Sequence, residues 1–172
     1  MEDILQMVAR LMELSARTAP KTAGQDFIGS KVISGADLVS LADAMEGYGR
    51  EKGRANYDRD ANNIRNSGAV LLLSLEDSKP AGLNCGACGK DKCGELIARE
   101  GAEFKGPLCA WRLIDLGIAL GSAAKTASIL NADNRMMYRV GVVAKKMGMM
   151  KGDVIVGIPL AATGKNIFFD RK

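Results

Sequence analysis

The sequence predicts one layered domain of the α/β or α+β class, in which helices pack on a sheet. Apolar residues recur at helical spacing in several segments, and two continuous apolar runs have the length of buried strands. The chain has 172 residues and is 47% apolar, which is enough to fill a hydrophobic core without disulfides. We therefore expect a single domain over residues 1–172.

The first half of the chain alternates helical and extended patterns. The apolar run Ala69–Leu75 is expected to form the central strand, because both of its faces suit burial. Another strand is expected over residues 26–33, and Ser34-Gly-Ala-Asp37 has the composition of a capping box that opens a helix. From apolar periodicity, the helices of this half are expected at residues 3–16, 35–52 and 58–67.

The second half contains the longest expected helix, Cys109–Leu130. Gly117 and Gly121 lie four residues apart on it, beside a line of alanines. Small residues let another backbone approach closely, either inside one domain or at a homodimer interface, and helical spacing does not separate these alternatives. A helix over residues 135–147 and a strand over residues 153–158 are expected to follow, before a basic tail that runs to Lys172.

Composition and charge exclude several classes of function. The chain has no histidine, which excludes imidazole acid/base chemistry. The charge-free stretch Leu116–Ala124 is far shorter than the roughly 20 residues that span a bilayer, so no membrane segment is expected. The net charge of +4 comes from interspersed charges without a basic block, so no nucleic-acid partner is expected. The acidic start, Met1-Glu2-Asp3, is unlike a signal peptide, and we expect a cytoplasmic location.

All four cysteines fall in one segment, as Cys85-x2-Cys88-x4-Cys93-x15-Cys109. A disulfide framework is disfavoured in a cytoplasmic chain that is large enough to fold alone. Structural zinc sites usually pair two short Cys-x-x-Cys-type units, whereas here three cysteines crowd together and the fourth stands apart. That arrangement favours an iron–sulfur cluster, with zinc as the alternative. Four thiolate ligands indicate a 4Fe–4S cluster that transfers electrons.

The residues around the cysteines suit such a cluster. Glycines permit positive φ and let backbone N–H groups point at sulfur, and the expected helix start after Pro107 stabilises a thiolate at Cys109. Four basic residues would surround the anionic centre, although they could equally form an ordinary solvated face. The glycines are Gly82, Gly86, Gly89 and Gly94, and the basic residues are Lys90, Lys92, Lys105 and Arg112. If Cys109 were not a ligand, an open iron could act as a Lewis acid in a non-redox lyase or desulfurising enzyme.

Short segments along nearly the whole chain carry a resemblance to a known family. They are Ala16-Arg-Thr-Ala-Pro-Lys21, Arg59-Asp-Ala61, Cys85-Gly-Ala-Cys-Gly89, Gly106-Pro-Leu-Cys109, Asp115-Leu-Gly-Ile-Ala-Leu-Gly121, Asp133-Asn-Arg135, Gly157-Ile-Pro-Leu160, Gly164-Lys165 and Phe168-Phe-Asp-Arg171. In these segments the chain resembles a family of uncharacterised prokaryotic proteins that contain a ferredoxin domain. This resemblance implies no particular activity.

A second resemblance is to nitroreductase-like flavoproteins. It rests on Arg17, Lys21, Asp115, Gly117, Ala119, Gly157, Pro159 and Lys165. It implies an α+β, nitroreductase-like fold with a central mixed sheet flanked by helices, a homodimer built on the long helix, and FMN as a cofactor. Within this fold, residues 76–109 would be an inserted Cys-rich iron–sulfur loop.

The same resemblance implies flavin contacts. Arg17 and Lys21 could clamp the FMN phosphate, and Lys165 could add a third positive contact or face the flavin ring. The alternative for Arg17 and Lys21 is an exposed basic turn after a helix, because the last helical carbonyls favour cations. Such flavoproteins usually have more than one arginine here. Asn134 and Arg135 could line a polar pocket or belong to a helix start.

These observations predict a 4Fe–4S redox protein that moves electrons between its cluster and a flavin or small-molecule acceptor. It would be a nitroreductase-like oxidoreductase, a homodimer, and in contact with a redox partner protein. The alternatives are a non-enzymatic electron carrier or redox sensor, and a structural zinc protein.

Overall fold

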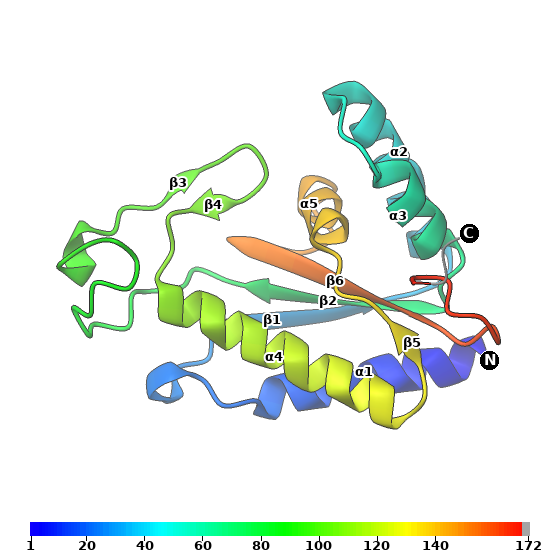
Figure 1. Ribbon diagram of the computed structural model, residues 1–172, viewed down its shortest axis with the longest axis horizontal. Helices are drawn as coiled ribbons and strands as arrows, with labels where there is room; N and C mark the ends of the chain where they lie inside the picture. Colours follow the sequence, from blue (N-terminus) through cyan, green and yellow to red (C-terminus); the bar gives the residue numbers. More distant parts are fainter. Residues whose placement is uncertain (170–172) are drawn as a thin grey trace.

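The computed structural model describes residues 1–169, and it places layers of helices on both faces of one four-stranded sheet (Figure 1). The strand order is β1-β2-β6-β5, and the strands are β1 (Ile28–Ile33), β2 (Ala69–Leu75), β5 (Asp133–Asn134) and β6 (Val154–Ala161). The end of the motif Phe168–Arg171 and the end of the predicted basic tail lie outside the described residues.

Within the described residues, every strand pair of this sheet is antiparallel, so the predicted mixed sheet is wrong. The reason is the strand order. The connection from β1 to β2 returns at the same end of the sheet, with Ile33 opposite Val70. The connection through α4 instead enters β5 at the opposite end from Leu75, so β5 runs in the same direction as β2, but the antiparallel strand β6 lies between them.

The predicted central strand is confirmed: all seven residues of β2 are buried. Because side chains alternate across a strand, β2 serves two separate cores. Leu71 and Leu73 contribute to the core beneath α1 and α4, whereas Val70 and Leu72 contribute to the core on the opposite face. The continuous apolar run is thus explained by burial on both faces.

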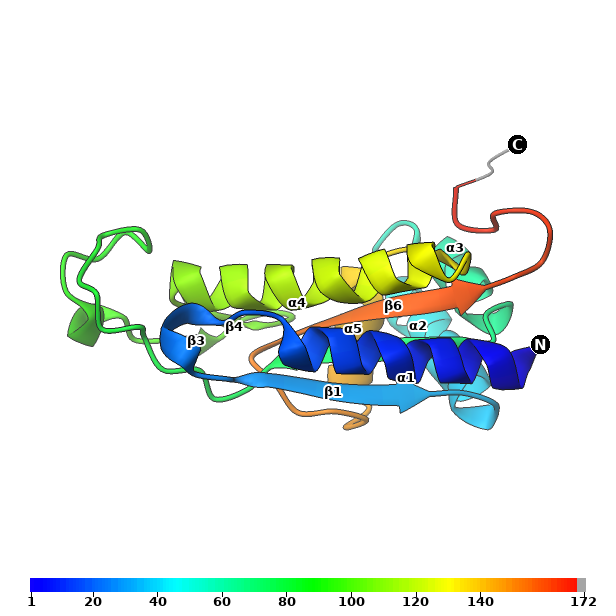
Figure 2. The same ribbon diagram turned by 90° about the horizontal axis from the view of Figure 1, so that it is seen from below.

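The helices follow the predicted periodicity closely. Figure 2 shows α1 and α4 side by side on one face of the sheet, and the other three helices cover the opposite face. Their bounds are α1 (Glu2–Thr18), α2 (Ala36–Lys52), α3 (Tyr57–Arg65), α4 (Ala110–Ile129) and α5 (Tyr138–Lys146). No helix in the described part of the chain has both the length and the apolar character that crossing a membrane requires.

One predicted helix cap and one predicted helix start are wrong. At α2 the expected capping box does not form, because the N-cap is Gly35 with φ of +58° and no side chain caps the helix. The helix predicted from residue 135 begins at Tyr138, because Asp133 and Asn134 pair with β6 as strand β5. Tertiary pairing overrides the local helical composition there.

The segment that carries the cysteines projects beyond the end of the sheet (Figure 1). It leaves β2 after Leu75 and includes the 3-10 turn η2 (Cys93–Glu95). It then forms a small hairpin of β3 (Arg99–Glu100) and β4 (Lys105–Gly106) before α4 begins. The candidate site therefore lies where this segment meets the first turn of α4.

Candidate metal centre

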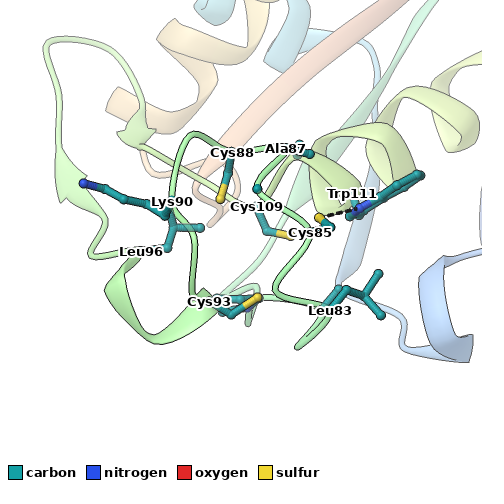
Figure 3. Close-up of a pocket in the computed structure, with 13 residues that line it drawn as sticks. Leu83, Cys85, Ala87, Cys88, Lys90, Cys93, Leu96, Cys109 and Trp111 are labelled. Atoms are coloured by element: carbon teal, nitrogen blue, oxygen red, sulfur yellow. Dashed lines mark hydrogen bonds between the residues drawn. The ribbon is translucent and has the colours of Figure 1, made fainter.

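All four cysteines of the chain line one hollow (Figure 3). The other lining residues are Pro80, Ala81, Leu83, Gly86, Ala87, Lys90, Leu96, Ala110 and Trp111. Among these residues, all within the described range, there is no carboxylate and no other strong metal ligand. The fold thus gathers four soft donors, distant in sequence by up to 24 positions, at one place.

Three distinct local structures hold the four cysteines. Cys109 is the N-cap of α4, as predicted, and its carbonyl accepts a hydrogen bond from Leu113 N–H at 3.1 Å. Cys93 opens the turn η2. Cys85 and Cys88 lie in a tight loop in which Gly86 and Gly89 have positive φ, and Gly89 N–H bonds to the Gly86 carbonyl.

The glycine prediction is partly wrong. Gly82 also has positive φ, at +80°, so three of the four glycines adopt the left-handed conformation that glycine favours. Gly94 instead lies inside η2 and is absent from the described positive-φ positions. Gly94 therefore does not supply the left-handed backbone conformation that was predicted for it.

Three N–H groups already point at cysteine sulfur. The Trp111 indole donates to Cys85 Sγ at 3.2 Å, and the Asn84 amide donates to Cys93 Sγ at 3.4 Å. Asn84 Oδ1 in turn accepts from the Cys93 amide at 2.9 Å. A hydrogen bond from the Ala87 amide, followed by that from Trp111, lowers the pKa of the Cys85 thiol. Such donors stabilise negative charge on sulfur.

Sequence reasoning missed both Trp111 and Asn84. The only signal for Trp111 was its position two residues after Cys109, and the indole contact depends on how residues 82–88 fold back. The only sequence signal for Asn84 is that asparagine tolerates positive φ better than most residues do. In the structure, Asn84 has a φ of +47°.

The geometry does not present a closed metal cage. Over residues 1–169, no three His, Cys, Asp or Glu side chains are grouped closely enough to hold a metal ion. The chemistry of the donor set nevertheless fits a soft metal or an iron–sulfur cluster, because four thiols and several N–H donors share one hollow. The loop would need to tighten around its ligand.

The predicted ring of basic residues forms only in part. Lys90 lines the hollow, but Lys105 pairs with Asp153 at 3.2 Å. Arg112 is fully buried and is not among the lining residues. The placement of Arg112 around an anionic centre is therefore wrong.

Arg112 instead fixes the start of α4. It donates to the carbonyls of Lys79 and Thr22, each at 2.9 Å, to Asp115 Oδ2 at 3.1 Å and to the Gln25 side chain. Its guanidinium also lies over the Phe27 ring. These bonds join the exit from β2, the turn after α1 and the first turns of α4. They hold in place the helix that carries Cys109.

The two predicted phosphate ligands have partners inside the chain. Arg17 pairs with Asp26 at 2.7 Å. Lys21 Nζ donates to three carbonyls at the end of α1, those of Ala16, Arg17 and Ala19, at 2.6–2.9 Å. Lys21 thus neutralises the negative end of the helix, as in the alternative reading, although its side chain is only 6% exposed.

The remaining predicted flavin contacts follow α4 in the chain. Asn134 donates to the Ala132 carbonyl at 3.1 Å, and Arg135 donates to the Phe168 carbonyl at 3.0 Å. Lys165 is exposed. Arg17 and Lys21 instead lie at the end of α1, and this region contacts α4 through the Ser15–Thr126 and Thr22–Asp115 hydrogen bonds. Within the described residues, neither Arg17 nor Lys21 is hydrogen-bonded to any of these three.

Comparisons with known sequences identify the family. Residues 105–171 match the family described as "Uncharacterized protein containing a ferredoxin domain (DUF2148)". An "Uncharacterized protein" of Archaeoglobus fulgidus is 45% identical over 169 residues, which cover 97% of this chain and 91% of that protein. The chain belongs to this family of ferredoxin-domain proteins. The segment matched to the family includes Cys109 but not the other three cysteines.

Solved structures with similar folds include nitroreductases. The FMN-dependent nitroreductase NfnB from Mycobacterium smegmatis, in complex with NADPH, superposes with a TM-score of 0.61 at 14% identity, covering 94% of this chain and 80% of that one. A Desulfitobacterium hafniense nitroreductase with bound FMN gives 0.59 at 12%, covering 92% and 78%. CinD from Lactococcus lactis, in complex with nicotinic acid, gives 0.59 at 13%, covering 96% and 84%. This ferredoxin-domain protein therefore has a nitroreductase-like α+β fold, and both predicted resemblances are confirmed.

Proposed function

We propose that this protein is a redox protein that holds a 4Fe–4S cluster at Cys85, Cys88, Cys93 and Cys109. The observation that carries the proposal is the shared hollow, which every cysteine of the chain lines, together with the N–H groups of Trp111 and Asn84 that donate to two of the sulfurs. The family description, which names a ferredoxin domain, supports it.

The chain's residues have defined roles in this proposal. The four cysteines bind as thiolates, and loading therefore releases their protons. The N–H groups of Trp111, Ala87 and Asn84 stabilise the negative charge on sulfur. A cluster with four thiolate ligands supplies one-electron transfer. Free thiols suit the reducing cytoplasm, where we place the protein.

The electron acceptor in this proposal is a flavin or a small molecule, which would make the protein a nitroreductase-like oxidoreductase. The support is the fold, since two of the similar structures are described with FMN. Arg17 and Lys21 at the end of α1, with Asn134, Arg135 and Lys165 in the segments after α4, remain the proposed flavin contacts.

The outer face of α1 and α4 supports a homodimer. Its exposed apolar residues are Ile4, Met7, Leu11, Leu14, Leu113, Ile114 and Ile118. The small residues of α4 face two environments. The alanines Ala119, Ala123 and Ala127 are buried in the core. Gly117 and Gly121, in contrast, have no atom of the chain near their Cβ positions. The glycines are thus free to let a second backbone approach. A large exposed apolar patch is typical of an interface.

Anaerobic purification tests the cluster directly. We expect a brown protein with stoichiometric iron and sulfide, and we expect Cys109→Ser to lose most of both. Serine is a favourable N-cap, so α4 should keep its start and the variant should stay folded. Iron, sulfide, zinc and flavin analysis with visible absorption provides the measurement, and circular dichroism controls for folding.

Other outcomes select the alternatives. Colourless protein with stoichiometric zinc would contradict the cluster and indicate a structural zinc protein. A cluster without flavin, even after incubation with FMN, would indicate an electron carrier or redox sensor. An intact cluster in Cys109→Ser would show that Cys109 is no ligand, which favours the open-iron lyase or desulfurising enzyme.

A further inference from the structure

Trp111 is the single tryptophan of the chain and lies in the first turn of α4, two residues after Cys109. Its side chain lines the hollow, and its indole N–H reaches back to Cys85 Sγ at 3.2 Å (Figure 3). Trp111 thus joins the helix that carries the last cysteine to the loop that carries the first. No other described side-chain N–H is bonded to a cysteine sulfur.

The neighbouring residue makes this contact well defined. Arg112 is fully buried and bonds to the exit from β2 and to the turn after α1. The backbone that carries the indole is therefore fixed to the body of the fold. Cys85, by contrast, lies in an exposed loop, so the indole restrains the sulfur rather than the reverse.

The indole can only donate a hydrogen bond, because it has no acceptor nitrogen. A donor of this kind favours whichever redox state places more negative charge on the sulfur. Adding an electron to a thiolate-bound cluster increases that charge, and hydrogen bonds to sulfur are among the factors that set cluster potentials. A ring beside an exposed sulfur also limits its access to water.

We propose that Trp111 is a positioning residue for the metal centre, one that holds Cys85 Sγ through its indole N–H and raises the reduction potential of the cluster. The inference rests on the proposed function. It adds a residue that tunes the reduction potential of the cluster to the four cysteines that bind it.

The first test compares Trp111→Phe, which keeps an aromatic ring but removes the N–H, with the wild-type protein. Potentiometric titration with dithionite should give a cluster in both, with the equilibrium constant for one-electron reduction about tenfold lower in the variant. For a one-electron couple that is about 59 mV more negative. Ile129→Ala is the matched control, because Ile129 is an exposed apolar residue of the same helix outside the hollow. Equal potentials in Trp111→Phe and wild type would overturn the inference.

The second test needs no metal. Thiols quench indole fluorescence at contact distance, so metal-free, reduced Cys85→Ala should show brighter Trp111 emission than the wild type. Cys93→Ala, which removes a thiol from the same hollow, should leave the emission unchanged, because Cys93 bonds to Asn84 rather than to Trp111. Unchanged emission in Cys85→Ala, or equal brightening in both variants, would refute the contact.

The two tests separate this inference from the proposed function. Wild-type protein that binds no cluster would refute the proposed function and the tuning role together, while the fluorescence comparison would still decide the contact. A loaded cluster whose potential is insensitive to Trp111→Phe would refute only the role of Trp111.

Discussion

Tyr57 shows how a single buried hydroxyl ties the cysteine segment to the body of the protein. It is 1% exposed, and its hydroxyl donates to Glu103 Oε1 at 3.2 Å. Glu103 lies in the turn of the β3–β4 hairpin and is also within 3.4 Å of the Tyr48 hydroxyl. Burial, and after it the negative charge of Glu103, raises the pKa of Tyr57.

This raised pKa predicts a loss of stability in alkali. The unfolded chain releases the Tyr57 proton near pH 10, whereas the folded chain keeps it, so the free energy of unfolding falls as pH rises above about 10. Below that pH the contribution is fully present. We expect Tyr57→Phe to be less stable than wild type at pH 7 by about 1 kcal/mol, with a shallower decline above pH 10. Chemical denaturation between pH 7 and 11 measures both, and parallel pH curves would contradict the prediction.

At the same scale, the sequence allowed the cysteine cluster to be anticipated but not its neighbours. The crowded spacing of Cys85, Cys88 and Cys93 is a local property that survives in any fold of the loop. The roles of Trp111 and Arg112 depend on contacts across more than 20 positions of sequence, which no local pattern encodes. Arg112 in particular was expected at a charged surface and is fully buried.

Among the helices and strands, the predictions were right where a local apolar pattern determines the element. They were wrong where pairing between strands determines it. The long helix α4 and the buried strand β2 lie within two residues of their expected bounds. The start of α5 moved because Asp133 and Asn134 pair with β6. Strand direction was also misjudged, since it depends on which end of the sheet each long connection returns to.

The glycines of α4 give a prediction at this scale. If the outer face of α1 and α4 is a dimer interface, Gly121→Arg should convert a dimer into a monomer, which light scattering after size exclusion would detect. No atom lies near the Gly121 Cβ position within the chain, and replacing a helical glycine adds about 0.5–1 kcal/mol to helix stability, so the monomer should stay folded. Gly47→Arg is the matched control, because Gly47 lies in α2 on the opposite layer and has equally open space. A Gly121→Arg variant that remains dimeric would refute this interface.

Over the whole molecule, the cores are built without the cysteine segment. Residues 76–108, all within the described range, include no buried residue. They contact the cores only through partly buried side chains such as Phe104 and Leu108. The two apolar cores on either face of β2 are instead filled by the helices and the sheet. A cluster ligand at Cys109 therefore sits at the margin of a body that is already packed.

We therefore expect the metal-free chain to remain folded. After metal removal with a chelator under reducing conditions, the far-ultraviolet circular dichroism should keep its helical signal and its cooperative thermal transition, because apolar burial supplies the stability. Trypsin should cut first at Lys90, Lys92 or Arg99, which lie in the cysteine segment, and loading should slow this cleavage by closing the loop over its ligand. Mass spectrometry of the fragments identifies the cut, with an equally exposed site on α2, Arg50, as the internal control. A metal-free chain without a cooperative transition would mean that the metal is part of the fold, which is the behaviour of a structural zinc protein and not of an electron-transfer centre carried on an independent scaffold.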